Sequence, residues 1–86
     1  MYFVYILRCK DNTLYTGITT NLDRRLKEHN RGTASKYTRI RKPVSLEYWE
    51  TSPNRSEASK REAEIKKLCK NEKELLITRR KAHENL

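Results

Sequence analysis

The chain has 86 residues, with 20 Lys and Arg against 11 Asp and Glu, and its formal net charge at pH 7 is +9. This length leaves no room for a second domain and supports only a modest core, so we expect residues 1–86 to form one domain. The positive charge disfavours self-association, which predicts a monomer, and it attracts polyanions such as nucleic acid or an acidic membrane surface.

No segment suggests secretion or a membrane partner. Met1 leads directly into a strand-like segment, without a basic leader, a long apolar run or a lipidation signal, so a soluble cytoplasmic protein is expected. Cys9 and Cys69 lie far apart and outside any C-x-x-C motif, and the only histidines are His29 and His83. This pattern favours two reduced structural thiols over a zinc site or a disulfide.

The first part of the chain predicts a β-hairpin. Residues 2–9, YFVYILRC, are rich in aromatic and branched apolar side chains, as in a strand that is covered on both faces. Residues 11–13 have turn composition, and residues 14–19, LYTGIT, resume with strand-forming residues, so the two segments are expected to pair antiparallel. Gly17 inside the second strand marks either a bulge or a close approach of another group.

A helix and a basic loop are expected next. Thr20 or Asn21 can cap the helix, which Asn-Arg-Gly at residues 30–32 ends, and its apolar stripe is Leu22, Leu26 and His29. Residues 32–43 read as a polar surface loop. Its cations are candidates for binding nucleic-acid phosphates, with an ordinary solvated surface as the simpler alternative: Lys36, Arg39, Arg41 and Lys42.

The rest of the chain predicts one strand and two helices. Residues 44–50 alternate, and one face of this strand is expected to carry Val44, Leu46, Tyr48 and Glu50. Asn54 opens a helix that runs to about Lys70, and Asn71, at capping-box spacing from Glu74, opens the last helix. The order β-β-α-β-α-α predicts an α/β chain of the α+β type, with helices packed on a three-stranded antiparallel sheet.

One carboxylate interrupts the apolar stripe of the second long helix. Glu62 shares this stripe with Ala58, Ile65 and Cys69. A carboxylate that faces a core needs an arginine, a metal ion or a cleft that admits water, because an unpaired buried charge is costly. The alternative is a Glu at the edge of the stripe that forms an ion pair with a nearby Lys.

Four other side chains could join Glu62 in one site. Arg25 and His29 lie one helical turn apart, and they offer a guanidinium that suits a phosphate and an imidazole that can relay a proton. Tyr5 and Tyr15 add phenols from the two paired strands. Each also has an ordinary structural explanation. Arg25 can be a charged residue on the side of the helix, His29 a histidine that is hydrogen-bonded at the edge of the core, and the tyrosines aromatic residues of the strands. Together, however, the five residues would supply the parts of a phosphodiester hydrolase.

In this arrangement the sequence resembles the GIY-YIG nucleases. The name-giving tripeptides correspond here to Phe3-Val4-Tyr5 and Tyr15-Thr16-Gly17, and the helix and glutamate motifs to TNLDRRLKEHN and EASKREAEIKK. The resemblance covers residues 2–68 and is closest to the small stand-alone bacterial members and the structure-specific endonucleases of the family. Each tripeptide alone is a weak signal, but four elements in order at fitting distances form a strong one.

The resemblance implies the GIY-YIG fold and a module that cuts DNA with one divalent ion, magnesium or manganese, held by Glu62. It further implies that Tyr5 and Tyr15 line the site, that Arg25 stabilises charge on the phosphate, and that His29 takes a position that is His or Tyr in the family. The expected role is in DNA repair or recombination, and the expected partners are DNA and a targeting protein. Arg79, Arg80 and Lys81 are further candidates for phosphate contacts.

The sequence departs from the family pattern at three points. Phe3 replaces the first glycine, Asn71 is the nearest candidate for the family's later asparagine, and no further DNA-binding domain is expected. Two other functions therefore stay open, a nucleic-acid-binding or adaptor module without cleavage and a structural RNA-associated protein. Because a binding module has no need of an unpaired carboxylate in an apolar stripe, the joint presence of all five site residues favours the nuclease.

Overall fold

The computed structural model describes the backbone of residues 1–84 and the side chains of residues 1–82. Its elements are β1 (Tyr2–Arg8), β2 (Leu14–Thr19), α1 (Leu22–Arg31), α2 (Lys36–Arg39), β3 (Ser45–Ser52), α3 (Arg55–Lys66) and α4 (Lys70–Glu84). The strands form an antiparallel sheet in the order β2-β1-β3. The expected fold class and element order are confirmed, and α2 is an additional single turn inside the expected loop. No helix within the described residues is long and apolar enough to cross a bilayer.

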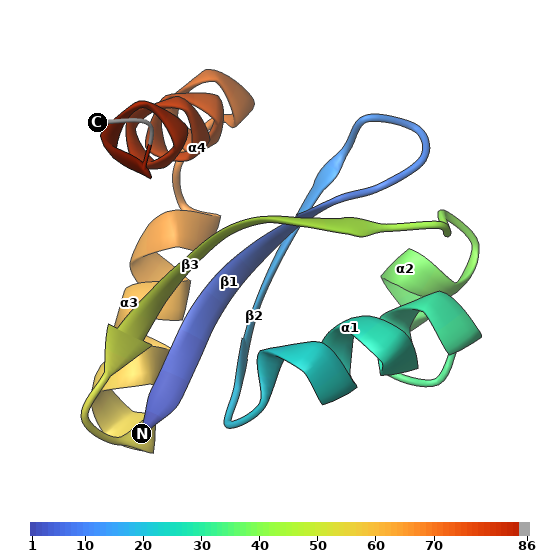
Figure 1. Ribbon diagram of the computed structural model, residues 1–86, viewed down its shortest axis with the longest axis horizontal. Helices are drawn as coiled ribbons and strands as arrows, with labels where there is room; N and C mark the ends of the chain where they lie inside the picture. The colour runs from blue at the N-terminus through green and yellow to red at the C-terminus, as the bar shows by residue number, and fades with distance from the viewer. Residues whose placement is uncertain (85–86) are drawn as a thin grey trace.

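The central strand β1 is buried on both faces, as its composition predicts. Val4 and Ile6 pack with Ala58 and Ile65 of α3 on one side of the sheet, and Ile77 of α4 completes this cluster. Another cluster lies on the opposite side, where α1 and α2 cover the sheet (Figure 1). Its buried members are Tyr5, Leu7, Cys9 and Val44. The sheet is therefore the middle layer between two groups of helices.

A β-bulge in β3 overturns the expected alternation of that strand. Ile6 pairs with Tyr48 and Leu7 with Leu46, so Glu47 has no partner on β1. Tyr48 consequently packs on the α3 side of the sheet, whereas Leu46 packs on the α1 side. One extra residue exchanges the faces of all side chains beyond it. The prediction of a single shared face is therefore wrong for Val44, Leu46, Tyr48 and Glu50.

The ends of the helices agree with the sequence at three caps and differ at the fourth. The Asn21 and Asn54 side chains cap α1 and α3, and Gly32 ends α1 at a φ of 85°. However, α3 ends at Lys66, earlier than predicted, and Cys69 is exposed between the helices, outside the apolar stripe in which it was expected. The Cys69 backbone N–H donates to Glu72 Oε1 at 3.1 Å, so this pair takes the capping role predicted for Asn71 and Glu74.

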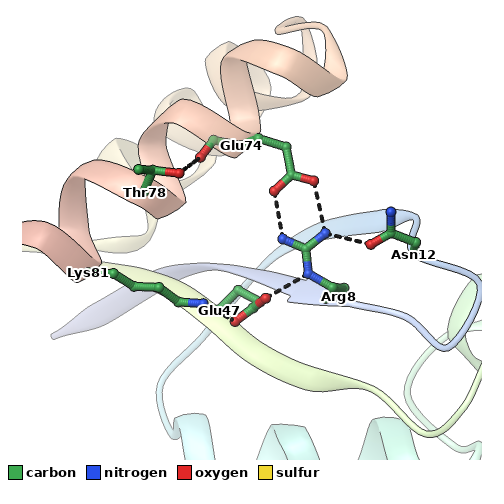
Figure 2. A network of polar contacts seen from close by, with 6 residues as sticks. All are labelled: Arg8, Asn12, Glu47, Glu74, Thr78 and Lys81. Carbon is green, nitrogen blue, oxygen red and sulfur yellow. Dashed lines mark hydrogen bonds and ion pairs between the residues drawn. The ribbon is translucent and has the colours of Figure 1, made fainter.

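An arginine on β1 attaches α4 to the sheet. Arg8 donates two hydrogen bonds to the Glu74 carboxylate, at 2.6 and 2.9 Å, and a third to Glu47 at 2.6 Å (Figure 2). Lys81 Nζ lies 3.0 Å from the same Glu47 carboxylate. The Arg8 guanidinium lowers the pKa of the Glu74 carboxyl, because its hydrogen bonds stabilise the ionised carboxylate.

The ring of Tyr5 explains the glycine of β2. Tyr5 and Gly17 face each other in a regular β1–β2 ladder, so Gly17 does not mark a bulge. A Cβ atom on Gly17 would lie 2.5 Å from the Tyr5 hydroxyl oxygen and 2.7 Å from the ring atom Cζ. The close approach of another group, one of the two explanations that the sequence offers, is therefore the correct one.

Replacing Gly17 should destabilise the protein. In Gly17→Ala the new methyl overlaps a buried ring, and we expect the free energy of unfolding to fall by about 1–3 kcal/mol in urea denaturation. Thr20→Ala, at an exposed position just beyond β2, is the control and should stay within about 0.5 kcal/mol of wild type. Wild-type stability in Gly17→Ala would show that Tyr5 can leave this position at little cost.

The Arg8 network gives another stability prediction. Glu74→Gln removes the charge that faces the guanidinium, and we expect it to lower the free energy of unfolding by about 1–3 kcal/mol, because Arg8 loses a charged partner. The matched control is Glu64→Gln, whose side chain is 67% exposed. Equal urea midpoints for the two variants would contradict a structural role for the Arg8–Glu74 pair.

Candidate active site

A buried chain of hydrogen bonds connects β1 with α1 and α2. The Tyr5 hydroxyl oxygen lies 2.8 Å from His29 Nε2, and His29 Nδ1 lies 2.7 Å from Thr38 Oγ1. The Thr38 hydroxyl donates to the Ser35 carbonyl at 3.4 Å. Because the Thr38 proton is directed to Ser35, His29 donates from Nδ1 and accepts the Tyr5 hydroxyl proton at Nε2. The geometry thus assigns both a tautomer and a direction to the chain.

Burial keeps both members of the Tyr5–His29 pair neutral. Burial raises the pKa of Tyr5 most, Tyr15 raises it further, Arg25 lowers it, and Glu62 raises it slightly. Burial, followed by the nearby Arg25 guanidinium, lowers the pKa of His29. At neutral pH the phenol therefore keeps its proton and the imidazole keeps a free lone pair, as the hydrogen-bond pattern requires.

All four of the other candidate residues interact with the Tyr5 hydroxyl. His29 accepts its proton, and Tyr15, Arg25 and Glu62 all act on its charge. These residues come from β1, β2, α1 and α3, on both sides of the sheet. They meet along the edge strand β2, because the Tyr5 ring crosses β2 at Gly17 and α3 packs against β2 from the other face.

Aromatic contacts hold Tyr15 in place. Its ring lies edge-on to His29, with 5.1 Å between centroids, and stacks on Tyr37 at 5.9 Å. The Arg41 guanidinium lies 3.9 Å from the centroid of the Tyr37 ring, donates to the Tyr37 carbonyl and pairs with Asp11 at 3.1 Å. Arg41, a predicted phosphate ligand, is thus engaged in a structural contact in this structure.

The other predicted phosphate ligands divide into two groups. Lys36, Arg39 and Lys42 are exposed around α2, next to the site. In α4, Arg79 is exposed, but Arg80 lies over the Trp49 ring at 3.9 Å and donates to the Trp49 carbonyl. Together with the Lys81–Glu47 contact, this arrangement uses two of the three predicted phosphate ligands of α4 to hold the helix against β3.

Arg25 and Glu62 each have a weak partner. Arg25 Nε lies 3.1 Å from Glu28 Oε1, but the angle is not that of a hydrogen bond, and Nε is buried without a hydrogen-bond partner. The Glu62 side chain is 23% exposed, and its carboxylate lies 3.4 Å from Lys66 Nζ. The alternative of an edge Glu paired with a Lys therefore describes Glu62 in this structure, and both side chains remain able to bind a ligand.

The side chains of the site suit a magnesium ion that also binds water and substrate, rather than a metal ion that is held entirely by protein ligands. Within the described side chains no three His, Cys, Asp or Glu residues gather into a group. Magnesium keeps several waters and is commonly bound through one or two carboxylates together with substrate phosphate oxygens. Glu62, whose side chain is 23% exposed and whose charge acts on the Tyr5 hydroxyl, can serve as the protein ligand of such an ion.

Two contacts of the candidate site were not predicted from the sequence. Thr38, which fixes the His29 tautomer, and Tyr37, which stacks on Tyr15, both fall in the segment read as a loop. The available signal was Ser35, a good N-cap whose hydroxyl accepts the Tyr37 backbone N–H at 3.1 Å and starts α2.

Known proteins resemble this chain over most of its length. Residues 1–75 match the family model described as the GIY-YIG catalytic domain. A UPF0213 protein of Clostridium perfringens is 55% identical over 78 residues, which cover 91% of this chain and 84% of the relative. A UPF0213 protein of the archaeon Halobacterium salinarum is 49% identical over 77 residues, which cover 90% of this chain and 100% of the relative.

Two solved structures have a similar fold. The solution NMR structure of the UPF0213 protein from Bacillus halodurans has a TM-score of 0.58 and 46% identity, covering 91% of this chain and 84% of that one. The NMR structure of a protein from E. faecalis also has a TM-score of 0.58 and 46% identity, covering 90% and 83%. The chain therefore belongs to the GIY-YIG family, whose members are generally nucleases, and within it to the small UPF0213 proteins of bacteria and archaea.

Proposed function

We propose that this protein is a divalent-metal-dependent endonuclease that hydrolyses phosphodiester bonds of DNA, in repair or recombination. The observation that carries the proposal is the surroundings of the Tyr5 hydroxyl. It is hydrogen-bonded to a neutral histidine and lies under the electrostatic influence of Tyr15, Arg25 and Glu62. A neutral phenol–imidazole pair beside a cation and a carboxylate suits proton transfer at a phosphate.

In this proposal the Tyr5–His29 pair accepts the proton of the attacking water. As the water oxygen bonds to phosphorus, its proton passes to the Tyr5 oxygen while the Tyr5 proton passes to His29 Nε2. The bond from phosphorus to the leaving oxygen breaks, and that oxygen takes a proton from solvent. The pair begins neutral, the state that burial favours for both groups. Thr38 keeps Nε2 free by accepting the Nδ1 proton.

The remaining residues of the site act on the phosphate. Arg25 donates to its oxygens and stabilises the charge that develops there, and Tyr15 orients the water from the edge strand. Glu62 would hold a magnesium or manganese ion, which supplies Lewis-acid stabilisation of a phosphoryl oxygen when bound. Lys66, 54% exposed, can turn into solvent when Glu62 takes this role.

Substrate binding in this proposal uses the exposed cations around α2. Lys36, Arg39 and Lys42 contact backbone phosphates and carry little sequence information. A targeting protein then supplies the choice of target, and the chain acts as a monomer. A non-catalytic adaptor is the second candidate, favoured by the ion pair that occupies Glu62 and by the 2% exposure of Tyr5.

A nicking assay separates the two candidates. With magnesium or manganese at low salt, on plain and branched DNA, we expect wild type to cut and Glu62→Gln to lose about 100-fold or more in rate, because the ion loses its carboxylate ligand. Glu64→Gln, an exposed carboxylate on the same helix, is the control and should cut normally. Equal cutting by both variants would contradict the role of Glu62. DNA binding without cutting by wild type would support the adaptor.

The neutral His29 predicts a pH dependence of stability. In the unfolded chain His29 has its ordinary pKa of about 6.5, and burial lowers the pKa in the folded protein. Between these two values the unfolded state binds more protons, so the free energy of unfolding should fall as pH decreases below about 6.5 and level off under the folded pKa. Urea denaturation across this range should show the slope in wild type and a reduced slope in His29→Gln. The same slope in both would contradict a neutral His29.

A further inference from the structure

A polar groove lies at the end of β2, beside the candidate active site. Its volume is about 230 Å³, and its lining residues are Tyr2, Ile18, Thr19, Thr20, Arg25 and Arg55. Arg25 belongs to α1 and Arg55 is the first residue of α3, and these two helices lie on opposite sides of the sheet (Figure 1). The groove is therefore lined from both helix layers. Because Arg25 also faces the Tyr5 hydroxyl, the groove and the site share a wall.

The charged residues that line the groove are all positive. Two arginines line it and no carboxylate does. Arg25 has an ion-pair contact with Glu28 on its own helix, at 3.1 Å and without hydrogen-bond geometry. Within residues 1–82, no carboxylate lies at ion-pair distance from Arg55. Two guanidinium groups beside one cavity repel each other, and an anion bound between them would remove this repulsion.

The position of Arg55 on α3 gives its distance from Glu62. Arg55 and Glu62 are at i and i+7, two turns apart on one side of the helix. At 1.5 Å per residue this spacing is about 10 Å along the helix axis. A strand of B-DNA advances about 3.4 Å per nucleotide, so the same distance corresponds to about three nucleotides.

We propose that this groove binds a backbone phosphate of the substrate, about three nucleotides or fewer from the phosphate that is cleaved, with Arg55 as its main ligand. The proposal rests on the proposed function and extends it to the path of the DNA. The planar fork of an arginine suits two phosphate oxygens. The groove has several times the volume of one water molecule, about 30 Å³, and so has room for the group.

This assignment places phosphate ligands near both ends of α1. The cations of α2 lie at the carboxyl end of α1, whereas Arg25 and the groove lie near its amino end. His29, which contacts Tyr5, belongs to the last turn of α1 and lies between Arg25 and the α2 cations along the chain. The DNA backbone thus crosses the site with phosphate ligands on both sides, and a contact on either side fixes the position of the cleaved bond without reading bases.

Salt dependence of binding tests Arg55 directly. Binding of a short labelled duplex is measured over a range of salt in EDTA, so that no cleavage occurs. We expect Arg55→Gln to reduce the slope of log K against log salt by about 0.9, the loss of one phosphate contact, and Arg55→Lys to retain most of the slope. Lys60→Gln is the matched control, because Lys60 lies on the same helix with a side chain 70% exposed and does not line the groove.

The possible outcomes test phosphate binding in the groove and DNA cleavage independently of each other. An unchanged slope in Arg55→Gln, or an equal loss in Lys60→Gln, would overturn the groove even if cleavage depends on Glu62. A slope that falls only in Arg55→Gln would support the groove even if no DNA is cut, and the proposed function alone would then fail. If wild type binds no duplex at low salt, the groove is overturned. In a cutting enzyme, Arg55→Gln should raise KM more than it lowers kcat.

Discussion

The hydrogen bond between Tyr5 and His29 is the interaction on which the arrangement of the site depends. It ties the central strand to α1 and forces the Tyr5 ring across β2, where only glycine leaves space. The same imidazole supports the Tyr15 ring and reaches Thr38 in α2. A side chain that could not accept the Tyr5 proton would leave a buried hydroxyl unpaired, at a cost of about 1–3 kcal/mol, and would release three elements from one another.

The other side of the sheet is stabilised by charge. Arg8 joins β1 to α4 through Glu74, and Arg61 joins α3 to β3 through Glu50. The Tyr48 hydroxyl donates to the same Glu50 carboxylate. The arginines in these pairs bind carboxylates within the protein, so they are not available to bind nucleic acid, although they contribute to the net positive charge. The net charge of +9 therefore overstates the number of cations that are available to a ligand. Those available near the candidate site include Lys36, Arg39 and Lys42 around α2 and Arg55 at the groove.

The sequence predicted those features that local patterns determine. The apolar run of β1, the caps Asn21 and Asn54 and the order of the elements each follow from neighbouring residues, and the structure confirms them. The bulge at Glu47 was not predictable in this way, since it appears only when β3 pairs with β1. The early end of α3, which leaves Cys69 exposed, likewise depends on how α4 turns back toward the sheet.

In the candidate site, too, local patterns were predictable and long-range contacts were not. Five residues at family spacing were recognisable, and their roles remain proposals, but the sequence did not reveal that an edge strand brings both helix layers together. Arg41 was read as a phosphate ligand because its charge was visible and its partners, Asp11 and Tyr37, were not. Thr38 was overlooked because a hydroxyl nine residues from His29 has no local signature. Long-range partners decide which polar residues are free to act.

An edge strand is a suitable place for such a site. Residues on opposite faces of a sheet are normally separated by the sheet itself, and they can meet only where it ends. Here Arg25 belongs to α1 on one side of the sheet and Glu62 to α3 on the other, and the missing side chain of Gly17 leaves room on β2 for the Tyr5 ring. A cation for the phosphate and a carboxylate for the metal can thus belong to separate layers without neutralising each other in an ion pair. The groove continues this geometry, since Arg55 extends the α3 layer to the end of the same strand.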